Sequence, residues 1–427
     1  MNFEFMKGNV LVLTLTRAIQ MFSMRMTMPF FSLFIIALGG EATDIGYVRT
    51  LRTLAALLIF PLAGYITDRQ GRVKVIALSG FMSALTFLFF VFATDWTHVA
   101  LGTFLQGLVM VHLPALGAIM ADSLPPRQRG IGFALSMAIP TTFSIFSPYI
   151  GGYVVDRFGV VTAMRWLFAS MLVLRLFSSA VRFKFLEETV DISGSGISLS
   201  SISQIMREAY GGVIGSLRWM PRNLWFLTVI MMLTSVSNAM VGPFWILYGL
   251  DVIGLSATQW GLLGLAAAVT SSVLGVPAGL VVDRVSKRLI LIVGLAATLI
   301  PVWFFIYARS FWEVLALTLV ISAANAFLMP ACQTIVAESV PRELRGRIMS
   351  AIGRGVIMVT GPGVGGGGGG GPGMGFVLTV PIIVGSLVGG YIYSASPTFS
   401  WILLTGALAL CVAISVVFVR DPQKIGS

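Results

Sequence analysis

Charged residues are scarce in this chain. Asp, Glu, Lys and Arg make up 11% of its 427 positions, whereas a soluble globular domain usually carries about 25%. So few charges cannot cover the molecule with a water-exposed surface. Apolar runs of about 20 residues, the length with which a helix crosses a bilayer, recur along the whole chain. We therefore predict a helical integral membrane protein.

Other scarcities exclude further classes of protein. The only two cysteines, Cys332 and Cys411, lie inside apolar runs and give neither a disulfide framework nor a metal-binding spacing. The sequence has no G-x-x-x-x-G-K-[ST] motif for ATP, no nucleophile elbow and no paired carboxylates within the apolar runs. Ten-residue segments of alternating polarity, which a membrane β-barrel requires, are absent as well. We expect no enzyme, no cofactor and no metal site.

The apolar runs predict twelve membrane spans. Single spanning segments must be helices, because each backbone amide has to find its partner inside its own segment. The first run is too long for a signal peptide and has no small-residue cleavage site. The expected spans are 9–37, 45–67, 75–93, 97–121, 131–155, 161–185, 223–249, 258–282, 288–307, 311–336, an interrupted eleventh ending near 395, and 399–419.

The net charge of +11 has an uneven distribution. Of the 28 Lys and Arg, 20 lie on the side of the membrane that carries the N-terminus, span ends included, two lie in the opposite loops, and the other six lie within spans. Cytoplasmic loops carry such an excess of basic residues. The basicity therefore predicts a multi-pass protein of the cytoplasmic membrane with both termini in the cytoplasm. We expect the lipid bilayer as its surroundings and no nucleic-acid partner.

The sequence repeats itself once. Residues 121–130 recur at 337–346, with acid, proline, arginine and glycine all displaced by 216 positions. A second pair of segments, 64–69 and 279–284, is displaced by 215. Six spans in each repeat make the halves parallel copies, an arrangement that favours a solute site near the midplane where they meet. We expect an N-terminal half at 1–185, a cytoplasmic linker at 186–222 that includes a surface helix or is simply solvated, and a C-terminal half at 223–427.

The loop after the second span carries the most specific motif. Residues 64–74 read Gly-Tyr-Ile-Thr-Asp-Arg-Gln-Gly-Arg-Val-Lys, which resembles the G-x-x-x-D-R-x-G-R-x-K motif of the major facilitator superfamily. The copy at 279–288 keeps the first glycine, the aspartate and the arginine, but has Ser286 in place of the second glycine. Residues 148–152 resemble the G-P-x-x-G-G motif of the family's antiporters, with Ser147 in place of its first glycine. The resemblance implies an all-α fold of twelve helices in two parallel six-helix halves, with a slight preference for the drug/proton antiporter branch.

Acidic and basic residues recur together at the cytoplasmic ends of both halves. A carboxylate there can pair with an arginine or with the positive end of a helix, and such a pair can form in one conformation and break in another. Asp68 can pair with Arg129 in this way, or lie at the N-terminus of a neighbouring helix. The alternative is that the bases only fix the topology. The expected gating residues are Asp68, Arg69, Arg72, Asp122, Arg129, Asp283, Arg284, Glu338 and Arg345.

Ionisable residues inside spans are costly and indicate functional sites. The N-terminal half has arginines in its first, second and sixth spans, and no carboxylate lies near the midplane of either half. Arginine suits carboxylate or phosphate, although snorkelling or packing would also explain some of these residues. The resemblance implies that the first, fourth, seventh and tenth spans line the cavity. The expected substrate-binding residues are Arg25, Arg52, Met24, Gln106, Asn238, Trp245 and Asn325.

Coupling to protons has little support in the sequence. Thr103 stands where the family's R-x-x-Q-G motif of the fourth span has arginine, although Gln106 and Gly107 are present. His112 is the one group in the middle of a span that would titrate near neutrality, and packing against a backbone carbonyl is its other interpretation.

The second half contains a glycine-rich insertion. Its repeat offset rises from 216 to 238 across residues 354–375, which include seven consecutive glycines. Glycine runs form flexible chain. We expect a cytoplasmic loop with the helix resuming near Phe376. The loop lies either across the cavity mouth or in solvent, and we favour solvent.

These features predict a monomeric secondary transporter that works by alternating access. Its small-molecule substrate is either an organic anion or an exported amphipathic, drug-like compound. A non-transporting receptor and a uniporter without ion coupling remain as alternatives.

Overall fold

The computed structural model describes residues 5–190, 206–207, 211, 215, 220–340, 348, 351–353, 355–363 and 375–421, with the side chain of Asp68 excluded. These residues form two helical bundles. Most of the expected surface helix at 202–219, and Arg345, lie outside the described residues. The helices of the N-terminal bundle are α1 (Gly8–Thr27), α2 (Phe31–Ala37), α3 (Ala42–Gln70), α4 (Arg72–Val91), α5 (Trp96–Leu108), α6 (His112–Asp122), α7 (Arg129–Phe143), α8 (Ser147–Phe158) and α9 (Val160–Phe185).

The C-terminal bundle follows the same order. Its elements are α11 (Arg222–Val241), α12 (Trp245–Leu247), the short η3 (Tyr248–Val252), α13 (Ala257–Arg284), α14 (Lys287–Phe304), α15 (Phe311–Ser339), α17 (Phe376–Ala395) and α18 (Pro397–Phe418). Eleven helical segments of the described residues are long and apolar enough to cross a membrane, and the bent pair α5–α6 makes a twelfth. The structure thus confirms an all-α membrane fold with the expected number of spans.

Several spans are broken at sites that the sequence explains. Proline removes a backbone donor and clashes with the preceding turn. Pro29 interrupts the first span, where a 3₁₀ turn over Met28–Phe30 separates α1 from α2. The fourth span bends by 42° between α5 and α6. Gly71, with φ 83°, ends α3 and lets α4 start at the next residue, which is the tight turn that the loop motif requires.

Each bundle has its own aromatic core. In the N-terminal bundle the rings of Phe90 and Phe168 stack with centroids 4.7 Å apart. In the C-terminal bundle Trp245 meets Phe305 at 4.5 Å and the ring of Trp401 at 5.4 Å. All five side chains are almost completely buried. Such ring pairs stabilise a core beyond the area that they bury, so each half has the means to move as a rigid unit.

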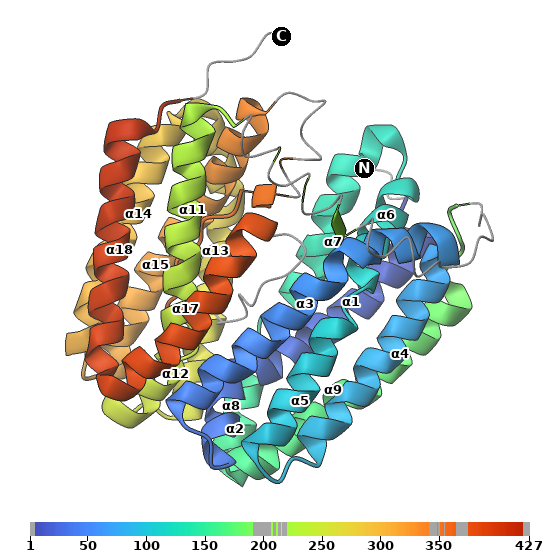
Figure 1. Ribbon diagram of the computed structural model, residues 1–427, viewed down its shortest axis with the longest axis horizontal. Coiled ribbons are helices and arrows are strands. Elements are labelled where there is room, and N and C mark those ends of the chain that lie inside the picture. Colours follow the sequence, from blue (N-terminus) through green and yellow to red (C-terminus); the bar gives the residue numbers. More distant parts are fainter. Residues whose placement is uncertain are drawn as a thin grey trace.

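The two bundles diverge toward the end of the molecule where both chain termini lie (Figure 1). We call this end the terminus side and the opposite end, near α2, α8 and α12, the far side. The ends of α8 and α13 pack together toward the far side, as do those of α3 and α17. The structure is therefore closed between the halves on the far side.

Candidate functional site

A cluster of arginines lies inside the N-terminal bundle. Arg49 and Arg52 come from α3, and Arg175 and Arg182 come from α9. Arg52 lies close enough to Arg49 and to Arg175 for the charges to repel one another. Carboxylates of this bundle's spans, among the described residues, occur only near helix ends. The interior of this half is therefore electropositive.

Two members of this cluster are held by hydroxyl and amide groups. The guanidinium of Arg182 donates to Thr16 Oγ1 at 2.9 Å and to Gln20 Oε1 at 3.3 Å. Arg175 donates to Ser83 Oγ at 3.1 Å, while its Nε is buried without a partner in the described part of the chain. Neutral acceptors orient these guanidiniums but leave their charge uncompensated.

Arg25, Arg49 and Arg52 differ from these two arginines. Each is partly exposed, and within the described residues none of the three makes a hydrogen bond or an ion pair. Arg49 approaches the C-terminal bundle, because its Nη1 is 3.8 Å from the position of a Cβ on Gly242. Arg25 is on α1, next to Met24, whose side chain is 43% exposed. These arginines can accept an anion without first losing a protein partner.

Gln106 is brought next to this group by helix packing. A Cβ on Gly107 would lie 2.6 Å from the carbonyl oxygen of Arg52, so α3 and α5 touch at this glycine. The glutamine side chain is partly exposed. The structure thus gathers the N-terminal substrate candidates on adjoining segments of α3 and α5, with Arg25 and Met24 on α1.

The C-terminal candidates Asn238, Trp245 and Asn325 bind the chain itself. Asn325 donates to the carbonyl of Val359 at 2.8 Å and accepts from its N–H at 2.9 Å. Asn238 donates to the carbonyl of Met358 and accepts from the backbone and the hydroxyl of Thr360. The indole of Trp245 donates to that hydroxyl at 3.3 Å.

The expectation that the insertion lies in solvent is therefore wrong for residues 355–363. Ile357 and Val359 are fully buried in the C-terminal core. Residues 364–374 lie outside the described part of the chain, and α17 begins at Phe376 as expected. The sequence could not show that a buried asparagine, Asn325, and a partly buried one, Asn238, would hydrogen-bond this segment from distant spans.

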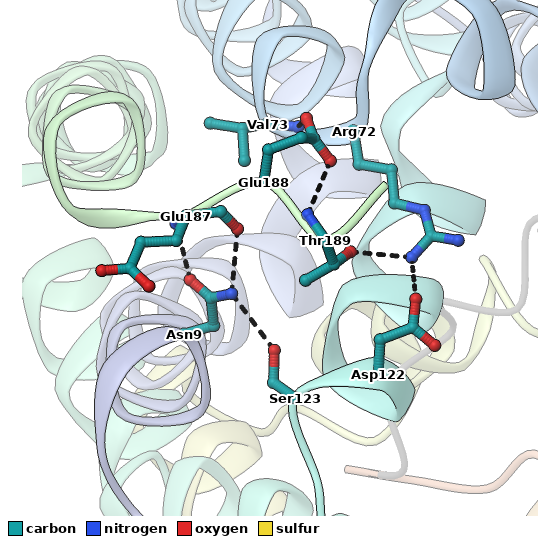
Figure 2. A network of polar contacts seen from close by, with 8 residues as sticks. All are labelled: Asn9, Arg72, Val73, Asp122, Ser123, Glu187, Glu188 and Thr189. Atoms are coloured by element: carbon teal, nitrogen blue, oxygen red, sulfur yellow. Dashed lines mark hydrogen bonds and ion pairs between the residues drawn. The ribbon is translucent and has the colours of Figure 1, made fainter. Parts of the chain in front are cut away.

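The charged motifs on the terminus side join elements within each bundle. Arg72 pairs with Asp122 and donates to Thr189 Oγ1 at 2.9 Å (Figure 2). In the C-terminal bundle Lys287 lies 4.0 Å from Glu338. Lys287 stands 215 positions after Arg72, and Glu338 stands 216 after Asp122. The same tie therefore occurs twice, and sequence reasoning missed Lys287.

Other expected gating residues have different surroundings. Arg129 donates to the carbonyl of Leu124 at 3.4 Å, and Arg69 lies over the ring of Tyr65. Asp283 and Arg284 are exposed. The expected pair of Asp68 with Arg129 involves a side chain outside the described set, so it stays a prediction.

Each bundle is also closed by an asparagine that sequence reasoning missed. Asn9 accepts from the N–H of Glu187 at 2.8 Å and donates to its carbonyl at 2.9 Å (Figure 2). Asn223 makes the same two bonds with the backbone of Arg420, at 2.8 and 3.0 Å. The two asparagines are 214 positions apart, so the repeat offset was the signal that could have found them.

Carboxylates that follow the last span of each bundle repeat as well. Glu188 accepts from the N–H of Val73, and Asp421 accepts from the N–H of Arg288. Both N–H groups lie in the first turn of a helix, α4 or α14, where a negative charge is favourable. Burial raises the pKa of Asp421, but its hydrogen bonds with Ser286 and this backbone outweigh burial and keep the pKa below its usual value.

His112 begins α6 at the bend of the fourth span. The side chain is buried, and its Nδ1 lies 3.2 Å from the carbonyl oxygen of Val109. This contact fits the packing interpretation of the residue. A role of His112 in proton coupling stays a prediction.

A carboxylate on the far side connects the halves. Asp156, near the end of α8, accepts from the N–H groups of Ala257 at 2.9 Å and Thr258 at 2.7 Å. These are the first residues of α13, in the other half, and helix N-termini need such acceptors. Tyr47 and Tyr391 join their hydroxyls across the same side.

Glycines let the backbones of the two halves touch on the far side. A Cβ on Gly152 would lie 2.2 Å from the oxygen of Ala257, and a Cβ on Gly390 would lie 2.7 Å from that of Ala42. The partners are related by the repeat, with offsets of 238 and 215. Gly152 belongs to the motif at 148–152, so this motif forms a seal between the halves.

Comparisons with known proteins agree with this architecture. The sequence is 25% identical over 348 residues to the multidrug resistance protein MdtG of Dickeya zeae (strain Ech586), covering 79% of this chain and 82% of that protein. The fold matches a variant of the nucleoside transporter NupG with a TM-score of 0.70 at 14% identity, covering 97% and 100% of the two chains. It also matches the human organic anion transporter MFSD10 (TETRAN) with a TM-score of 0.61 at 15% identity, covering 95% and 98%.

A family model matches most of the chain. The Major Facilitator Superfamily profile matches residues 13–232 and 224–382, one segment for each bundle. Together with two bundles of matching helix order and repeated terminus-side ties, this match shows that the chain belongs to the Major Facilitator Superfamily of membrane transporters, which are not enzymes.

Proposed function

We propose that this transporter exports amphipathic organic anions. The observation that carries the proposal is the set Arg25, Arg49 and Arg52: three partly exposed arginines that make no ion pair among the described residues. Cations held inside a membrane protein attract anions, and guanidinium binds carboxylate or phosphate through two parallel hydrogen bonds. Met24, which is exposed on α1, supplies apolar surface for the rest of such a molecule.

Alternating access supplies the transport step. The structure is closed on the far side by the Asp156 contact and the glycine seal, while the bundles diverge on the terminus side (Figure 1). With the termini in the cytoplasm, as the basic loops predict, this state receives cargo from the cytoplasm. Rocking of the two bundles then releases the cargo outside. The name of the MdtG relatives, multidrug resistance protein, supports export as the direction.

A second candidate is the export of uncharged apolar compounds, possible because methionine side chains adapt to varied ligands. Met24, exposed on α1, is the observation that favours it. The two candidates predict different results when an arginine is replaced: transport falls if the cargo is an anion and is unchanged if the cargo is uncharged.

Transport in proteoliposomes tests the proposal. Purified protein would be assayed with a panel of organic anions, organic cations and neutral compounds, with and without a pH gradient. A charge-assisted hydrogen bond contributes about 1.5–3 kcal/mol, so Arg25→Gln or Arg52→Gln should reduce kcat/KM for anions more than about tenfold. Arg165→Gln is the matched control, because Arg165 donates to the carbonyl of Ala93 near the far side. Anion transport unchanged in both variants, with neutral compounds carried, would favour the second candidate.

The same assay addresses coupling. If His112 exchanges protons with the pathway, His112→Asn should abolish the effect of the pH gradient and leave exchange at equal pH intact. An unchanged pH response would leave the histidine with its packing role against Val109.

A further inference from the structure

The insertion in the second half begins and ends at one place. A Cβ on Gly375 would lie 2.3 Å from the nitrogen of Gly353 and 2.4 Å from the oxygen of Ala351. Gly375 has φ 75°, and α17 starts at the next residue. The chain therefore returns at Gly375 to the point that it occupied at Ala351 and Gly353, directly before α17 begins.

Residues 355–361, the first part of the insertion, run along α15 toward the far side. Gly355 is beside Val336, and the backbone of Ile357 is beside the thiol of Cys332. Val359 is hydrogen-bonded to Asn325, and Gly361 is beside Ile321. Fifteen residues of α15 cover about 22 Å, and the six steps from 355 to 361 cover about 20 Å when extended. Residues 355–361 are thus an extended segment antiparallel to α15, reaching past the middle of that helix.

Asparagine side chains provide hydrogen-bond partners for the backbone of this segment. Backbone groups at membrane depth tolerate non-helical structure only where protein or water supplies their partners. Asn325 gives Val359 both a donor and an acceptor, as a neighbouring strand would, and Asn238 does the same for Met358 and Thr360. These amides are occupied by the chain, so they are not available to cargo while the segment is in place.

The segment has two unlike faces. Side chains alternate between the faces of an extended chain. Ile357 and Val359 are 0% exposed and pack into the C-terminal core. Val356 and Met358, which alternate with them, are partly exposed.

We propose that residues 355–363 are a fixed lining of the transport pathway on the C-terminal side, whose Val356 and Met358 contact the apolar part of the cargo. The proposal rests on the proposed function, since it divides one amphipathic molecule between two halves. The N-terminal arginines bind its anionic group, and the segment selects its apolar portion. Asn238 and Asn325, expected from the sequence to contact substrate, instead position the segment.

A chain-length series of anions tests the selection. Proteoliposomes with wild type, Met358→Ala or Val356→Ala would be assayed with n-alkyl carboxylates or sulfates from short to long. Loss of apolar contacts in a binding site costs about tenfold in kcat/KM, so both variants should lose about that factor for long anions and nothing for the shortest. Met82→Ala is the matched control, because Met82 is an exposed methionine on α4, which packs within the N-terminal bundle.

The arginine variants separate this proposal from the proposed function. Arg52→Gln should reduce transport of short and long anions alike. If it does so while Met358→Ala and Val356→Ala change no substrate, the lining proposal is overturned and the anion proposal stands. If Arg52→Gln and Arg25→Gln leave anion transport unchanged, the proposed function fails instead.

A disulfide tests whether the lining is fixed. Ile357→Cys places a thiol beside the native Cys332, in a Cys411→Ala background, and Cys332→Ala in the same chain is the control that cannot cross-link. Oxidation should form the cross-link and leave transport at the level of the reduced protein. Failure to cross-link would show that the segment does not lie against α15. Loss of transport on oxidation, restored by reduction, would show that the segment must move, which also overturns the proposal.

Discussion

Individual asparagine side chains connect distant segments of this molecule through hydrogen bonds to the backbone. Asn9 and Asn223 each connect the first helix of a bundle to the chain just after its last helix. Asn238 and Asn325 hold the segment 355–363. One carboxamide both donates and accepts, so it can bind a backbone N–H and a backbone carbonyl at once, which no charged side chain can do.

We predict that Asn9→Leu destabilises the protein more than Asn223→Leu. Asn9 is 9% exposed and also donates to Ser123 Oγ, whereas Asn223 is more exposed. Leaving a buried donor and acceptor unpaired costs about 2 kcal/mol, and a wetter site costs less. Thermal unfolding in detergent would measure both. Ser123→Ala, which removes only the third bond of Asn9, should have a small effect; equal losses from all three variants would contradict this account.

At the scale of elements, the helices were predictable and their irregularities were not. Apolar runs and prolines predict the spans, and the repeat predicts their order. The extended segment 355–363 could not be predicted, because its position depends on hydrogen bonds to Asn238 and Asn325 in distant spans. The tie of Lys287 to Glu338 was within reach of the repeat, since Arg72 occupies the matching position.

The N-terminus of α13 carries a prediction at the same scale. Its first two N–H groups bond Asp156 of the other half, and loss of an N-cap acceptor costs about 1 kcal/mol. Asp156→Ala should therefore shift the equilibrium about fivefold toward a state that is open on the far side. Spin labels at Phe158 and Phe399, both exposed, would report the distance between the halves. Asp251→Asn, which alters an exposed acid of the C-terminal bundle, should leave the distance distribution unchanged; a shift there as large as that of Asp156→Ala would argue against the capping role.

At the scale of the whole molecule, the two halves are alike where they touch and unlike at the proposed cargo site. The far-side seal repeats as Gly152 against Ala257 and Gly390 against Ala42. Among the described residues, arginines deep within a span occur only in the first half, and the segment 355–363 has no counterpart there. The candidate site was therefore predictable on the N-terminal side, from buried charge, and only in part on the C-terminal side, where the expected asparagines bind the protein itself.

The close packing at the far-side seal predicts the effect of larger side chains at its glycines. Gly152→Leu and Gly390→Leu each place a side chain where a Cβ already overlaps the opposite backbone. Overpacking of this kind costs about 1–3 kcal/mol, and only the state closed on the far side bears the cost. Both variants should populate a state that is open on the far side, which the distance between spin labels at Phe158 and Phe399 would show as an increase. Gly279→Leu, on a glycine with open space around it, is the control, and a closed far side in Gly152→Leu would contradict the seal.

The segment 355–363 has a consequence for motion as well as for shape. Its anchors all belong to the C-terminal bundle, whereas the arginines belong to the N-terminal one. On the proposed arrangement, cargo contacts one point on each bundle, and rocking of the bundles changes the distance between these two points. A molecule too short to reach both contact points would bind equally well in both states of the cycle. One that reaches both points would be bound tightly in one state and released in the other. Cargo length would then set the rate of turnover as well as the strength of binding.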